Sequence, residues 1–123
     1  MATKEKHIRK AEHNERFVDL FDIDTTPFLD WAITGIFYSA IHYIRALAAK
    51  HSFINISTYG EMDNLFNRIS VFKNNRSAYV DYRQLKDDSR TARYEMIKFS
   101  TPEVRSLKNG EFQRIKSFVL ANI

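Results

Sequence analysis

The fold class is decided by one stretch, residues 28–50, which reads F-L-D-W-A-I-T-G-I-F-Y-S-A-I-H-Y-I-R-A-L-A-A-K. Apolar side chains recur along it at steps of three and four, the spacing of one face of an α-helix. These positions are Ile33, Phe37, Ala40, Ile44 and Leu47. The opposite face carries Trp31, Gly35, Tyr38, His42 and Arg45. A helix with apolar or aromatic residues on two sides is typical of the centre of a bundle, so we expect this one to be central.

The flanking sequence predicts further helices of the same kind. Helical periodicity is present over residues 3–20, 58–72 and 78–97, and again from residue 100 to the end. Alternation with a period of two, which would indicate a strand, is not found. The pattern therefore predicts an all-α, up-and-down bundle of about five helices that forms one domain over residues 1–123.

The expected helix ends have recognisable signals. Thr26 is expected to be the N-cap of the central helix, with Pro27 at its first position. T-Y-G-E at residues 58–61 has the spacing of a capping box, and S-T-P-E at residues 100–103 opens the last helix. Asn109-Gly110 is expected to bend, fray or split that last helix. Met96 is expected on the inner face of the helix over residues 78–97.

The overall composition limits the classes of protein. The chain has 123 residues, a net charge of +4 and no cysteine, which excludes disulfides, thiol nucleophiles and cysteine metal sites. Its N-terminal stretch is polar, and no apolar run approaches the roughly 18 residues of a membrane span. We therefore expect a cytoplasmic protein without a membrane association. The positive charge mildly favours anionic partners.

One charged residue is expected to point inward. Arg93, in S-R-T-A-R-Y-E-M (residues 89–96), lies close in helical angle to Tyr82, Ser89 and Met96. A buried guanidinium needs a partner. That partner is either a carboxylate, such as Asp30 of the same chain or an acid of a second chain, or an anion bound by two parallel hydrogen bonds. Candidate ligand-binding residues on the same helix are Ser89, Arg90, Arg93 and Tyr94.

The central helix carries a second group of candidates. Tyr38, His42 and Arg45 follow one another at steps of four and three, so they lie on one stripe. This stripe is either a hydrogen-bonded polar layer of the bundle or part of a ligand site. No two histidines share a helical face at ligand spacing with a carboxylate nearby, so we expect no metal and no cofactor.

Three stretches together resemble the HEPN-domain family. They are K-E-K-H-I-R-K-A-E-H-N-E-R-F (residues 4–17), D-W-A-I-T-G-I-F-Y-S-A-I-H-Y-I-R-A-L (residues 30–47) and Y-R-Q-L-K-D-D-S-R-T-A-R-Y (residues 82–94). The resemblance implies a helical bundle that commonly forms a homodimer. It also implies an association with RNA or nucleotides, often in toxin-antitoxin or defence systems, beside an antitoxin or a nucleotidyltransferase-like partner.

The ribonuclease members of the family carry an Arg, then four to six other residues, then a His, near a late helix. This chain departs from that pattern, because no histidine follows Arg90 or Arg93. Arg45 and His51 have the nominal spacing but belong to another helix, where such a short match is expected by chance. The catalytic motif is therefore not carried over, and enzymatic activity is left open.

Three functions follow from these features. The first is a non-catalytic module that binds RNA or nucleotide in a cleft lined by Tyr38, His42 and the residues around Arg93. The second is a metal-independent endoribonuclease with a rearranged catalytic pair, His42 and Arg93, since such groups can meet in space from distant positions. The third is a helical protein-interaction module in which Arg93 pairs with a carboxylate.

Overall fold

The computed structural model describes residues 3–53 and 55–123, and over these residues the chain is helical with no strand. The prediction of an all-α bundle is therefore confirmed. The elements are α1 (Lys4–Asp19), α2 (Leu29–Lys50), α3 (Tyr59–Arg68), α4 (Ser70–Lys73), α5 (Arg76–Tyr94), α6 (Thr101–Ser106), the π-helical turn η1 (Leu107–Phe112) and α7 (Gln113–Ala121). No helix in the described part of the chain is long and apolar enough to cross a membrane.

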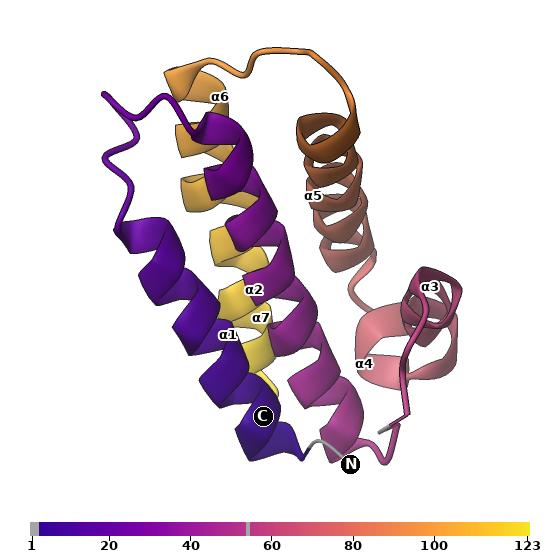
Figure 1. Cartoon of the computed structure of the whole chain (residues 1–123). Coiled ribbons are helices and arrows are strands. Elements are labelled where there is room, and N and C mark those ends of the chain that lie inside the picture. Colours follow the sequence, from indigo (N-terminus) through magenta and orange to yellow (C-terminus); the bar gives the residue numbers. More distant parts are fainter. Residues whose placement is uncertain (1–2, 54) are drawn as a thin grey trace.

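Four long segments run alternately up and down in Figure 1: α1, α2, α5 and the continuous α6–η1–α7. The short helices α3 and α4 form a separate corner beside the lower end of α5. Alternating directions place the N- and C-terminal ends of the chain at the same end of the bundle (Figure 1). Helix α2 lies at the centre, in contact with α1, α5 and α7.

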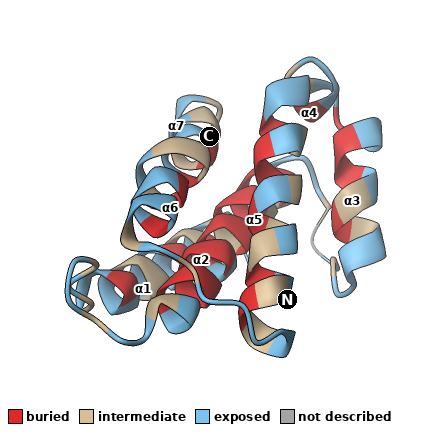
Figure 2. Cartoon of the chain, turned by 90° about the horizontal axis from the view of Figure 1, so that it is seen from above, coloured by how far each residue is buried: buried red, intermediate tan, exposed pale blue. Residues whose placement is uncertain are grey.

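The central position of α2 follows from its two-sided apolar pattern. Its predicted inner stripe is buried: Ile33, Phe37, Ala40, Ile44 and Leu47 have at most 1% of their surface exposed. In Figure 2 α2 is largely red, whereas the outer helices are red on one side only. The opposite face is more varied, because Gly35 is buried against α1 while Trp31 and Tyr38 reach the surface.

Helix α1 packs along α2 through small residues and buried polar contacts. The hydroxyl of Ser39, which is fully buried, donates a hydrogen bond to the carbonyl oxygen of Ala11 at 2.8 Å. At the start of α1, Thr3 is the N-cap and its hydroxyl accepts from the backbone N–H of Lys6. This cap satisfies one of the free N–H groups of the first turn.

The predicted start of α2 was wrong by two residues. Phe28, not Thr26, is the N-cap, and Pro27 lies outside the helix. The hydroxyl of Thr26 instead accepts from the backbone N–H of Phe28 at 3.1 Å, so it stabilises the turn before the helix.

The helix expected over residues 58–72 is broken. Thr58 caps it as predicted, since its hydroxyl accepts from the N–H of Glu61. Ile69 then adopts an extended conformation and separates α3 from α4. This break allows both Ile69 and Phe72 to reach the core, where both are buried.

The predicted bounds of α5 were also wrong at its C-terminal end. The helix ends at Tyr94, and Glu95 is extended with φ −116° and ψ 152°. Met96, expected on the inner face, therefore lies beyond the end of the helix. Its side chain is fully exposed, with a relative accessible surface of 104%. Ser100 and Glu103 form a capping box at the start of α6, where the last helix was predicted to begin. Asn109-Gly110 falls in the π-helical turn, where the helix continues without splitting.

Candidate functional site

Six of the seven candidate residues line two neighbouring pockets. The α2 pocket, with a volume of about 470 Å³, is lined by Tyr38, Ile41, His42, Arg45, Ser57, Thr58 and Tyr59. The α5 pocket, of about 390 Å³, is lined by Tyr59, Arg83, Lys86, Asp87, Arg90, Arg93 and Tyr94. Tyr59, at the first position of α3, belongs to both and forms the wall between them. The tertiary structure thus brings the two candidate groups together.

Arg93 is half-buried and hydrogen-bonded to hydroxyl groups. Its Nη1 donates to the hydroxyl of Tyr38 at 3.1 Å and to that of Ser89 at 3.0 Å. The guanidinium carbon also lies 5.7 Å from the centre of the Tyr38 ring and 5.4 Å from that of Tyr94. These neutral partners orient the guanidinium without cancelling its charge.

No carboxylate pairs with Arg93 within the described residues. The alternative of an ion pair with Asp30 is therefore wrong for this chain. Arg45 and Arg90 are likewise absent from its ion pairs, over the same residues. The Nε atoms of Arg45 and Arg93 are buried and have no hydrogen-bond partner among residues 3–53 and 55–123.

The other cations of the α5 pocket are partly neutralised. Asp63 on α3 accepts from Lys86 at 3.2 Å and lies 3.9 Å from Arg83. The same carboxylate also accepts a hydrogen bond from the hydroxyl of Tyr82 at 2.8 Å. Asp63 and Asp87, which lines the pocket, together offset the charges of Arg83 and Lys86, so the excess positive charge of this pocket comes from Arg90 and Arg93.

The α2 pocket combines a neutral histidine with a cation. Burial, and after it the charges of His7, Arg45 and Lys10, together lower the pKa of His42 to about 4. At neutral pH His42 is therefore an uncharged hydrogen-bonding group. The Nδ1 atoms of His42 and His7 lie 3.0 Å apart, so His7 on α1 contacts a residue that lines this pocket without lining it itself.

One candidate has a role other than the one expected, and two residues were missed. Ser89 is fully buried and orients Arg93 without lining a pocket. Tyr59 was missed because it stands beside a helix cap with no repeating pattern around it. Burial and then Tyr38 raise the pKa of Tyr59, whereas Arg93 lowers it, which reflects how close these groups are. His7 was missed because its partner lies on another helix.

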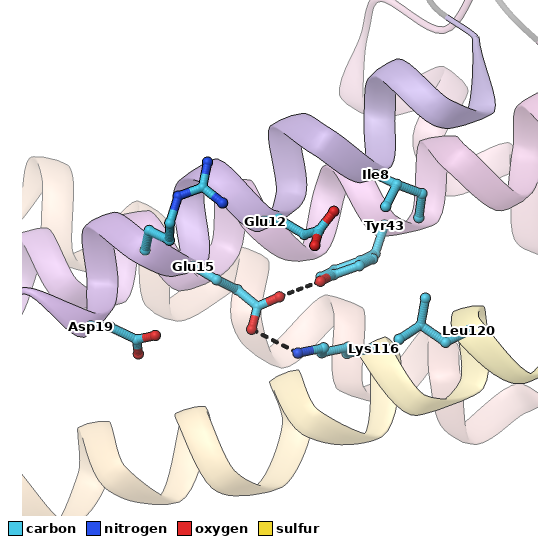
Figure 3. Close-up of a pocket in the computed structure, with 8 residues that line it drawn as sticks. Ile8, Glu12, Glu15, Asp19, Tyr43, Lys116 and Leu120 are labelled. Atoms are coloured by element: carbon cyan, nitrogen blue, oxygen red, sulfur yellow. Dashed lines mark hydrogen bonds and ion pairs between the residues drawn. The ribbon is translucent and has the colours of Figure 1, made fainter.

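A third cavity lies in the groove between α1 and α7 and has a volume of about 380 Å³. Glu15 spans it: one carboxylate oxygen accepts from the hydroxyl of Tyr43 and the other pairs with Lys116 at 2.9 Å (Figure 3). This chain of contacts ties α1, α2 and α7 together. Glu12, Glu15 and Asp19 outnumber the two bases Arg16 and Lys116 along this groove, so it lacks the net positive charge of the other two pockets.

The described residues contain no group of three or more histidine, aspartate or glutamate side chains that could hold a metal ion. The His7–His42 pair is surrounded by the cations Lys10 and Arg45, which disfavour a further positive charge. Comparison with known proteins gives no match to a family model, to a curated protein or to a solved structure.

Proposed function

We propose that this protein is a HEPN-like helical module that binds single-stranded RNA or a nucleotide across the α2 and α5 pockets. The observation that carries this proposal is the set of three arginines, Arg45, Arg90 and Arg93, that line two adjoining pockets without carboxylate partners. A phosphate group accepts paired hydrogen bonds from a guanidinium, which suits these positions.

The aromatic side chains between the arginines favour a nucleic-acid ligand over a simple inorganic anion. Tyr38, Tyr59 and Tyr94 are all exposed, and Tyr59 separates the two pockets. Exposed rings interleaved with cations are typical of surfaces that stack bases and contact the phosphate backbone. The net charge of +4 adds a weak attraction in the same direction.

Fluorescence anisotropy with a labelled, short single-stranded RNA tests this function. Arg93→Ala should weaken binding roughly tenfold or more, because a charge-assisted hydrogen bond contributes about 1.5–3 kcal/mol. It should also reduce the slope of log affinity against log salt by about 0.7. Arg16→Ala is the matched control, since it removes the same charge from the α1–α7 groove. No binding at low salt, or equal losses in both variants, would refute the proposal.

A metal-independent endoribonuclease is the second candidate, because its proposed catalytic pair, His42 and Arg93, has Tyr38 as a common neighbour. Tyr38 accepts from Arg93 and lines the same pocket as His42. A histidine with a pKa near 4 is a proton acceptor at neutral pH but a poor proton donor, which disfavours acid–base catalysis by His42 alone. RNA incubated with the protein in chelator should be cut by the wild type and spared by both His42→Ala and Arg93→Ala if this activity exists.

We further propose that the protein forms a homodimer, following the resemblance to HEPN-domain proteins. An antitoxin or a nucleotidyltransferase-like protein is the partner that the same resemblance favours. Sedimentation velocity over a range of protein concentrations measures whether the homodimer forms. A monomer at all concentrations would remove the dimer from the proposal and leave the pockets, which lie within one chain, intact.

A further inference from the structure

His7 and His42 form a contact between α1 and α2 that the proposed function does not use. Their Nδ1 atoms are 3.0 Å apart and their ring centres 5.3 Å apart. His7 is 8% exposed, whereas His42 is half-buried and lines the α2 pocket. The contact therefore joins a buried residue of one helix to a ligand-pocket residue of the next.

The distance restricts the protons of the pair. Two imidazole Nδ1 atoms at 3.0 Å share one hydrogen atom, so one ring donates through Nδ1–H and the other accepts through its Nδ1 lone pair. Two facing lone pairs would repel, and two facing N–H groups cannot approach so closely. The two rings must therefore be in different tautomers while α1 stays docked on α2.

The surroundings keep both rings neutral. Lys10 on α1 and Arg45 on α2 are the charged groups beside them, and Tyr59 on α3 lines the same pocket. No carboxylate pairs with either histidine in the described part of the chain. Burial first, and then Arg45, lower the pKa of His7 as well as that of His42.

From this geometry we propose that His7 is a positioning residue: it donates its Nδ1–H to His42 and so holds the His42 ring with Nε2–H available to an anionic ligand. Since Nδ1 of His42 is engaged by α1, Nε2 is the only ring nitrogen left for a ligand. A phosphate oxygen requires a donor there, which assigns Nδ1–H to His7 and Nε2–H to His42. Which ring donates therefore rests on the proposed function, whereas the single hydrogen shared by the two Nδ1 atoms follows from their distance alone.

Nitrogen-15 NMR of the histidine side chains tests the assignment in the wild-type protein at neutral pH, because the two tautomers have distinct spectra. His42 should be in the Nε2–H form and His7 in the Nδ1–H form. The reverse assignment, or two Nε2–H rings, would overturn the proposal without any variant.

Two substitutions at His7 then separate positioning from packing. His7→Asn places an amide donor near the former Nδ1–H, whereas His7→Phe keeps a ring and removes the donor. His42 should keep its tautomer in His7→Asn and lose it in His7→Phe, with affinity for the short single-stranded RNA reduced roughly tenfold only in the latter. His13→Asn, on the same helix, is the control.

The outcomes are distinguishable. An unchanged His42 spectrum in a folded His7→Phe protein would refute the positioning role. If the wild type binds no RNA but shows the expected tautomers, the proposed function fails and the positioning of His42 stands. If His7→Phe does not fold, the His7→Asn variant decides. Retention of the Nε2–H tautomer of His42 in that variant supports the role of the His7 donor, and loss of that tautomer refutes it.

Discussion

The close approach of α1 and α2 is tested by adding a single methyl group at Gly35. A Cβ atom built there would lie 2.8 Å from Cγ2 of Val18 and 3.0 Å from Cδ2 of Phe17. Ordinary contacts between carbon atoms are about 3.5–4.0 Å, so the methyl group does not fit without movement. Phe17 is partly exposed and its ring can swing outward, but Val18 is buried and branched.

Two effects of opposite sign determine the result of Gly35→Ala. Alanine favours the helix by about 0.5–1 kcal/mol relative to glycine. Inserting a methyl group into a packed core costs about 1–3 kcal/mol. Because the nearest atom belongs to the buried Val18, we expect the steric cost to exceed the helical gain. The net loss should be about 1 kcal/mol, which lowers the melting temperature by roughly 3–5 °C.

Urea denaturation followed by circular dichroism measures this loss, and Gly60→Ala is the matched control. At Gly60, in the first turn of α3, a Cβ atom meets only the Thr58 hydroxyl oxygen, at 3.9 Å. The control should therefore be more stable than the wild type by about 0.5 kcal/mol. If Gly35→Ala gained stability as Gly60→Ala does, the two helices would be further apart than described.

Three further predictions concern the core, the α1–α7 groove and acid. Phe37→Ala should cost about 3–5 kcal/mol in urea denaturation because the ring is fully buried, and a loss below about 1 kcal/mol would place it outside the core. Tyr43→Phe should cost about 1 kcal/mol, since it removes the hydrogen bond to Glu15, and an unchanged midpoint would show that this bond contributes nothing. Because folding lowers the pKa of His7 and His42 below the ordinary value of 6.5, the unfolded chain binds more protons in acid. Unfolding free energy should therefore fall as the pH drops below 6.5, down to about pH 4 for His42, by at most about 1.4 kcal/mol per pH unit for each histidine. Denaturation at several pH values measures this slope, and a flat profile would contradict the buried pair.

Sequence periodicity was a sound guide to the helices because it reflects which side of each helix faces the core. The stripe through Phe37 and Ile44 was predicted from spacing alone, and both residues are buried. Caps with a local hydrogen bond, at Thr58 and Ser100, were also predicted correctly. In each case the interacting groups lie within a few residues of one another.

Helix ends without such local signals were predicted poorly. Ile69 interrupts a helical pattern and Glu95 ends another, yet neither is a glycine or a proline. The periodic pattern continues to Met96, although that residue is exposed. Competition between local preference and the packing of the whole bundle decides such positions.

What the sequence determined by itself was the helical class, the central position of residues 28–50 and the inner-face register of Arg93. The tertiary structure alone decided which groups meet that arginine: the hydroxyls of Tyr38 and Ser89, and no carboxylate of the described chain. It also paired His7 with His42 across two helices. The physical reason is range, because a helical face is specified by residues three or four apart, whereas contacts between helices depend on how the entire core packs.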